Sequence, residues 1–154
     1  MSPWGQGSAT VDQMLADGRL ERVPANPVAA QALIDKAQTH LGSAAVLAGT
    51  DVELAYDALH AANRKALTAV LLAQGLRPTR VAGHTGVYEA VRAQLDPPLG
   101  CPTLAPYSRI RRARNAGDYL DALPASPDDV RADLPLCQAI VDAARKVLGQ
   151  MPPY

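Results

Sequence analysis

The sequence predicts an all-α fold, an up-down bundle of four main helices with a short N-terminal helix and a C-terminal helix added. Three observations lead there. Of the 154 residues 48% are hydrophobic and only 4% aromatic, with no Phe, and 29 are Ala. Alanine is the best helix former, and small side chains let helices approach closely. Apolar residues recur at steps of three and four, and no stretch alternates as a strand does.

The N-terminal part begins with residues 1–8, which are rich in Gly, Ser and Pro and are expected to be disordered. A short helix is expected over residues 8–17, stopped by Gly18. The pair Asn26-Pro27 marks the start of the first long helix, because Asn caps helices and Pro suits their first position. The residues expected on its buried face are Ala30, Leu33, Ile34, Ala37, Leu41, Ala44 and Ala48. Gly49 ends it, and Thr50 or Asp51 caps the next helix.

The second long helix is expected from Val52 to Gln74, with Gly75 at its C-cap and Pro78 just beyond. Its buried face is predicted to carry Ala55, Leu59, Ala62, Ala66, Val70 and Ala73. A third helix covers residues 85–95 and ends before Pro97-Pro98.

A fourth helix begins near Thr103, with Pro106 in its first turn, and reaches Tyr119. The last helix is capped by Ser126 and runs to Leu148. Its inward residues are predicted to be Leu136, Ile140, Val141, Ala144 and Val147, and Pro135 is expected to kink or divide it. One helical domain over residues 9–150 results, followed by a tail of residues 151–154.

Charge and composition exclude several classes of protein. Fifteen basic residues balance fifteen acidic ones, which argues against a chain that coats nucleic acid or membrane over its whole surface. Apolar runs are too short to span a bilayer, and the N-terminus does not read as a secretory signal. Cys101 and Cys137 could form one disulfide, but two reduced thiols in a cytoplasmic protein are favoured. The three His are not at metal-ligand spacing with the cysteines, so no metal or cofactor is expected.

The most unusual segment, residues 107–119, holds four arginines within six residues: Arg109, Arg111, Arg112 and Arg114. Arg111, Arg114, Asn115 and Asp118 share one helical face. Guanidinium groups match phosphate, and Tyr119 adds a phenol that can stack on a base. Two interpretations stay open, a phosphate or RNA site and an exposed basic face with an Arg114–Asp118 ion pair. Spacing alone favours the second.

A second segment runs over residues 63–79 and is followed by Gly83-His84-Thr85-Gly86. A single His at a helix start is more often a capping or packing residue than a catalyst. Asp35, Asp57 and Lys65 are expected to be solvated charges.

This second segment resembles the HEPN superfamily (higher eukaryotes and prokaryotes nucleotide-binding). The resemblance rests on residues 61–69, on Gly75-Leu76 and Gly83-His84, and on the arginine-asparagine segment at the place of the family's signature motif. It covers roughly residues 25–150 and is greatest to an actinobacterial group of the superfamily, which the alanine-rich composition suits.

Catalytic members of the superfamily are metal-independent endoribonucleases in which an Arg and a following His are separated by four to six residues. Two protomers bring these motifs together across a dimer interface. Arg114 matches the arginine and Asn115 the polar residue after it, but positions 119–121 hold Tyr119, Leu120 and Asp121. A tyrosine, with an ordinary pKa of about 10, is a poor base at neutral pH.

The resemblance therefore implies a dimeric, catalytically degenerate module that binds RNA, a nucleotide or a partner protein such as a nucleotidyltransferase-type antitoxin. The alternative is a metal-independent endoribonuclease toxin that uses Arg114, with Tyr119, Asp118 or His84 in place of the missing histidine. Leu104, Tyr107 and Ile110, beside the arginines, are expected to supply the apolar part of a dimer interface.

Overall fold

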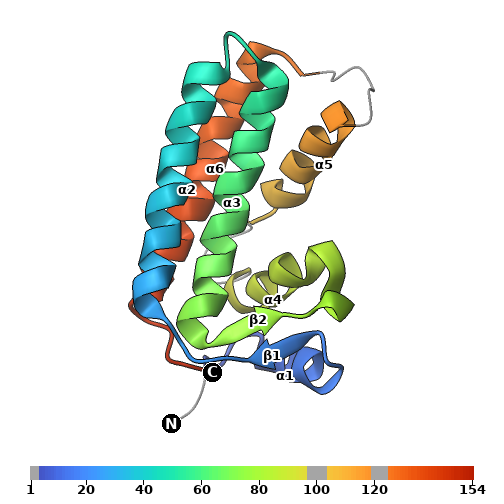
Figure 1. The fold of residues 1–154 in the computed structure, drawn as a ribbon, viewed down its shortest axis with the longest axis vertical. Coiled ribbons are helices and arrows are strands. Elements are labelled where there is room, and N and C mark those ends of the chain that lie inside the picture. The colour runs from blue at the N-terminus through green and yellow to red at the C-terminus, as the bar shows by residue number, and fades with distance from the viewer. Residues whose placement is uncertain (1–3, 97–103, 119–124) are drawn as a thin grey trace.

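The computed structural model describes residues 4–96, 104–118 and 125–154. Over these residues the chain is mostly helical, which confirms the all-α prediction in its coarse form (Figure 1). The helices are α1 (Ser8–Ala16), α2 (Pro27–Leu47), α3 (Val52–Gln74), α4 (Gly86–Leu95), α5 (Pro106–Asp118) and α6 (Pro127–Leu148), with a 3-10 segment η1 (Arg80–Thr85) before α4.

Three long helices form the body of the molecule. Helices α2, α3 and α6 lie side by side, and α2 runs opposite to the other two (Figure 1). Helix α5 packs beside α3, whereas the shorter α4 and α1 cover one end of the body. No helix in the described part of the chain is long and apolar enough to cross a membrane.

The long helices begin where the capping residues predict. The Asn26 side chain accepts a hydrogen bond from the Ala29 N–H at 3.0 Å, and that of Asp51 accepts one from the Leu54 N–H at 3.0 Å. Ser126 and Asp129 form a reciprocal capping box at the start of α6. These side chains satisfy backbone donors that would otherwise lack partners in the first turn.

Gly75 ends α3 in the left-handed conformation, with φ of 75°. A Cβ at this position would lie 2.6 Å from the Val23 carbonyl oxygen, which is closer than any side chain tolerates. The glycine therefore lets the chain turn directly into a strand beside residue 23.

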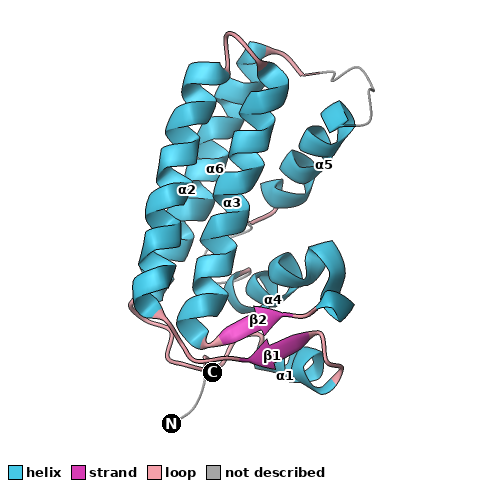
Figure 2. Ribbon diagram, in the orientation of Figure 1, coloured by secondary structure: helices cyan, strands magenta, loops and turns pink. Residues whose placement is uncertain are grey.

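A two-stranded antiparallel sheet corrects the prediction that the chain has no strands. Strand β1 (Leu20–Arg22) pairs with β2 (Leu76–Pro78), Glu21 lying opposite Arg77, at the end of the bundle beside α1 and α4 (Figure 2). Strands of three residues are too short to show the alternation of apolar and polar residues that predicts a strand. Pro78, a residue that argues against a strand, also lies in the second one. An ion pair of 2.6 Å between Arg77 Nη2 and Glu21 Oε1 links the strands.

The buried face of α3 is predicted correctly, since all six expected residues are buried. On α6 the prediction fails at Leu136, which is 42% exposed. Cys137 lies inward instead, in register with Val130, Ile140, Val141 and Ala144, because one helical position is a rotation of about 100°. Pro135 lies inside α6 without dividing it.

The apolar residues before and within α5 are already used inside the chain. Leu104, Tyr107 and Ile110 are at most 3% exposed and belong to the hydrophobic core that the described residues form. This corrects the expectation that they form the apolar part of a dimer interface. Their burial explains instead why a helix with so many arginines packs onto α3.

Both ends of the described chain contact the domain. Trp4 donates through Nε1 to the Gln94 carbonyl at 3.0 Å, so the expected disordered lead is held at that point. Tyr154, within the expected tail, donates its backbone N–H to the Gln74 carbonyl and its hydroxyl to Asp12. Residues 4 and 154 are therefore both tied to the helical part of the chain.

Candidate nucleic-acid interface

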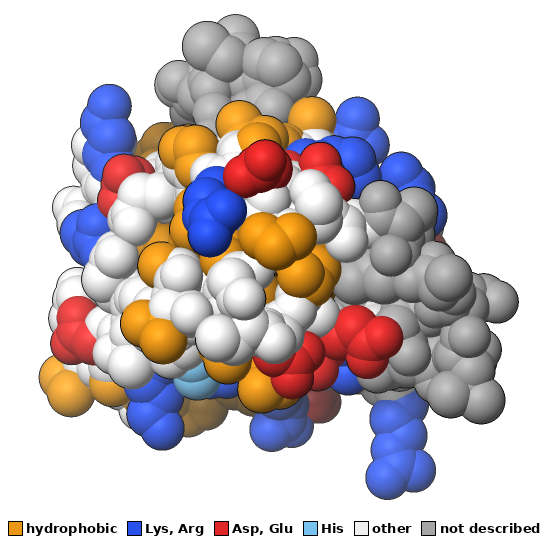
Figure 3. All heavy atoms as spheres, turned by 90° about the horizontal axis from the view of Figure 1, so that it is seen from above, with side chains coloured by type: hydrophobic (Ala, Val, Ile, Leu, Met, Phe, Trp, Pro, Cys, Tyr) orange, Lys and Arg blue, Asp and Glu red, His pale blue; other side chains and the backbone are white. Residues whose placement is uncertain are grey.

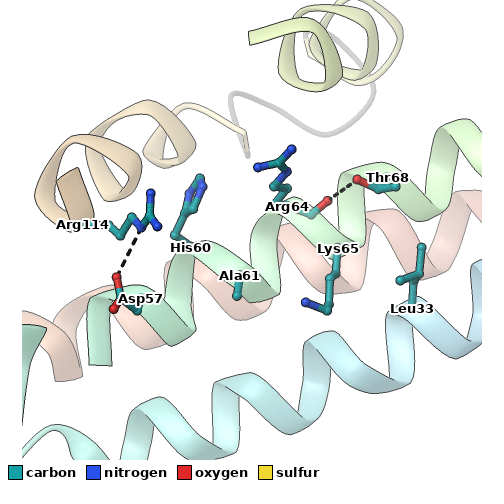
Figure 4. A pocket seen from close by; sticks show the side chains of 8 residues that line it. All are labelled: Leu33, Asp57, His60, Ala61, Arg64, Lys65, Thr68 and Arg114. Atoms are coloured by element: carbon teal, nitrogen blue, oxygen red, sulfur yellow. Dashed lines mark hydrogen bonds and ion pairs between the residues drawn. The ribbon is translucent and has the colours of Figure 1, made fainter. Parts of the chain in front are cut away.

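A cleft of about 590 Å³ lies beside the polar face of α3 (Figure 4). Its lining comes from α3, from Arg114 on α5 and from Leu33 on α2. The α3 residues are Asp57, His60, Ala61, Arg64, Lys65 and Thr68. Their spacing of three and four places all of them on one face of the helix. The same helix thus supplies the core with one face and the cleft with another.

Arg114 closes one end of this cleft. Its Nε lies 3.3 Å from Asp57 Oδ1, and its Nη1 donates to Asn115 Oδ1 at 3.2 Å. Asp57 was expected to be a solvated charge, whereas it is paired with an arginine 57 residues away. The pair is about half exposed, so water screens it and its net stabilisation is small.

Arg109 lies apart from the cleft and binds the other side of α5 to α6. Its Nη1 and Nη2 donate to the two oxygens of Asp133 at 2.9 and 2.6 Å. The Tyr56 hydroxyl donates to the same carboxylate at 2.7 Å. Asp133 is only 4% exposed, and burial together with this carboxylate raises the pKa of Tyr56 and keeps it a donor. Arg109 therefore balances a buried charge rather than adding to a phosphate site.

The structure brings only part of the predicted site together. Arg114 lines the cleft, and Asn115 contacts it through Arg114. Arg112 is exposed, and neither it nor the half-buried Arg111 is among the lining residues. Tyr119 and the side chains of Asp118 and His84 lie outside what the structure describes.

Cys137 carries a free, buried thiol, and burial raises its pKa to about 12.

His60 is the first residue that the sequence did not reveal. It is 8% exposed, its ring centroid lies 5.7 Å from that of Tyr107, and its Nδ1 has no hydrogen-bond partner among the described residues. Burial lowers the pKa of His60 to about 4, helped by the charges of Arg114, Arg64 and Arg111. The imidazole is therefore neutral at physiological pH and lies among three arginines.

Arg64 and Lys65 are the other residues that the sequence did not reveal. In the described part of the chain neither has an ion-pair partner. Figure 4 shows Arg64 on the same side of α3 as His60, and Lys65 directed towards α2. The signal that could have found them is the recurrence of polar residues at helical spacing from Asp57 to Thr68 on a helix rich in alanine.

The chain's neutral charge is divided unevenly over its surface. The described residues that line the cleft include three cationic side chains, those of Arg64, Lys65 and Arg114, and one carboxylate, that of Asp57. At the end of the bundle seen in Figure 3, basic, acidic and apolar side chains intermingle over the part that the described residues form. The described lining of the cleft is therefore more basic than the chain as a whole, whose net charge is zero.

Buried His60 predicts that the folded state weakens in mild acid. The unfolded chain protonates this residue near its ordinary pKa of 6.5, whereas the folded chain does so only near 4. Over that interval the unfolded state binds more protons, so the free energy of unfolding falls as the pH falls, by up to about 3 kcal/mol. Urea denaturation at a series of pH values measures this. The matched His60→Phe variant should lose this part of the pH dependence, and an unchanged profile would contradict it.

Comparison of the chain with protein-family models, with curated proteins and with solved structures finds no match. In the described residues, no group of His, Cys, Asp and Glu is placed to hold a metal ion. What the cleft can bind is therefore inferred from the side chains that line it.

Proposed function

We propose that the chain is a HEPN-like helical module that binds RNA or a nucleotide through the cleft between α3 and α5, without cleaving it. The observation that carries this proposal is the convergence of Arg64 and Arg114, from two different helices, on one basic cleft. Guanidinium groups present forked donors that match the oxygens of a phosphate.

The pairing of Arg114 with Asp57 is compatible with binding. The ion pair is half exposed and 3.3 Å long, so a phosphate can displace the carboxylate at little cost. An internucleotide phosphate carries the same unit charge as a carboxylate, but a strand brings several such charges to the cations of the cleft at once. Asp57 then holds Arg114 in place while the site is empty.

The partners in this proposal come from the resemblance. They are a second copy of the chain and a nucleotidyltransferase-type antitoxin in a toxin–antitoxin or defence setting. Because Leu104, Tyr107 and Ile110 are buried within one chain, a dimer would have to use other side chains.

A second function, metal-independent RNA cleavage, is favoured by one observation, the neutral His60 imidazole that lines the cleft with Arg114. In such a reaction His60 would accept the proton of a ribose 2′-hydroxyl. The 2′-oxygen would then attack phosphorus, and the bond to the 5′-oxygen would break as that oxygen takes a proton from water. The hydroxide left behind would take the proton held by His60, which regenerates water and the neutral imidazole. The arginines would stabilise the charge that develops on the phosphate. A pKa of about 4 makes His60 a weak base, so binding without cleavage ranks first.

One experiment separates these functions. The purified protein is incubated with transfer RNA and with total RNA, with and without EDTA, beside the His60→Gln and Arg114→Ala variants. We expect a mobility shift that salt abolishes, with intact RNA. Cleavage that survives EDTA and is lost in both variants would establish the ribonuclease instead. Absence of both binding and cleavage at low salt would overturn the proposal.

A further inference from the structure

The cations of the cleft lie at two levels along α3. Arg114 is held beside Asp57, whereas Arg64 and Lys65 lie seven and eight residues further along the helix. With a rise of 1.5 Å per residue, these levels are about 10–12 Å apart. One phosphate group is too small to contact both levels.

The positive region continues from the cleft onto α2. Leu33 lines the cleft, and Lys36 and His40 follow it at steps of three and four on the same helix, hence on a shared face. Lys65, which is directed towards α2, and Lys36 both lower the pKa of His40, after burial as the main cause (Figure 4). Asp35, on the same helix, accepts a hydrogen bond from Gln31 at 3.1 Å.

We infer that the cleft binds a single-stranded RNA segment of about four nucleotides or more, with one phosphate subsite at Arg114 and a second at Lys65 and Lys36. This inference rests on the proposed function and names its substrate class. A stacked strand carries one charge per ~3.4 Å, so about three phosphate steps bridge the two levels. Between them the buried His60 lines the cleft, and Thr68 and Leu33 border the far end.

A strand fits this arrangement better than a compact ligand does. A mononucleotide would satisfy one subsite and leave the other cation level without a partner. The forked donors of Arg64 and Arg114 suit phosphate oxygens, and cations at two levels of the cleft suit a backbone of regularly spaced charges. An acidic peptide shares only the charge, and it therefore serves as a competing ligand in the test.

The test is a length series measured by calorimetric titration of the intact chain. The ligands are uridine monophosphate, oligouridylates of two, four and eight nucleotides that each carry a 5′-phosphate, and an octaglutamate peptide. We expect the affinity to rise at least about tenfold from the dinucleotide to the tetranucleotide and then to level off, because the second subsite adds its own counterion release. The peptide should bind more weakly than the octanucleotide.

Two double variants locate the second subsite. Lys36→Ala with Lys65→Ala should lower the affinity for the tetranucleotide about tenfold while leaving the dinucleotide unchanged. Arg145→Ala with Lys146→Ala, on α6, removes the same charge elsewhere and should change neither ligand's affinity by as much. Circular dichroism melting checks that both variants fold.

Three results would overturn part of this picture, and they are distinguishable. Equal affinity for the monophosphate and the tetranucleotide, or an unchanged length series in the lysine variant, removes the second subsite and leaves the proposed function standing. If octaglutamate binds as tightly as the octanucleotide, the ligand of the cleft is an acidic protein segment and not RNA. Failure of every ligand to bind removes the proposed function itself.

Discussion

Replacing both Arg64 and Arg114 by alanine is expected to weaken the binding of a short single-stranded RNA about 100-fold at low salt. A hydrogen bond to a charged group contributes about 1.5–3 kcal/mol, and each 1.4 kcal/mol is a factor of ten. Both arginines face the same cleft, so their contributions concern the same ligand. Fluorescence anisotropy of a labelled oligouridylate measures the change.

The matched control is the double variant Arg131→Ala with Arg145→Ala. Both residues lie on α6, and like Arg114 each is paired with a carboxylate, Asp128 at 3.1 Å and Asp142 at 2.8 Å. The control variant has the same change in net charge as the arginine variant. It should therefore lose only the affinity that comes from long-range electrostatic attraction to the RNA. Asp57→Asn should act in the opposite direction and strengthen binding, because it removes the carboxylate that competes for Arg114. Equal losses in the two double variants would contradict a site at the cleft.

The second large effect concerns the buried carboxylate of α6. Asp133→Ala is expected to lower the free energy of unfolding by about 3 kcal/mol, because it leaves the buried Tyr56 hydroxyl without its acceptor and Arg109 without its partner. Denaturation by urea measures the loss. The control is Asp142→Ala, which removes a carboxylate 55% exposed on the same helix and should cost less than about 1 kcal/mol. If the two variants lost the same stability, the network around Asp133 would have no special role.

Local sequence signals predicted most of the helix boundaries, because capping acts over a few residues. Asn26-Pro27, Asp51, Gly75 and Ser126-Pro127 each fix a helix end within one turn. The sequence did not predict the sheet, because its strands are three residues long and pair across more than 50 residues. Leu136 was wrongly predicted to be buried because helical spacing defines the buried face only to within one position. The helices that pack against α6 decide which residue lies inward.

The sequence predicted the candidate site only in part, and the physical reason is the geometry of a helix. The four arginines are close in sequence, but a helix turns them to different sides. Arg109 therefore reaches Asp133 on α6, whereas Arg114 reaches Asp57 on α3. Asp57 was interpreted as a solvated charge because the helix that carries its partner Arg114, α5, lies more than 40 residues further along the chain. Only the fold shows that His60 lies next to Arg114.

The most direct measurement of the central claim is a titration of the isotope-labelled protein with octauridylate, followed by amide chemical shifts in nuclear magnetic resonance spectra. We expect the largest changes at His60, Arg64 and Thr68 on α3 and at Arg114 on α5, with small changes at Leu136 and Arg145 on α6. Largest changes on α6 or at the sheet, or no changes at all, would contradict RNA binding in the cleft.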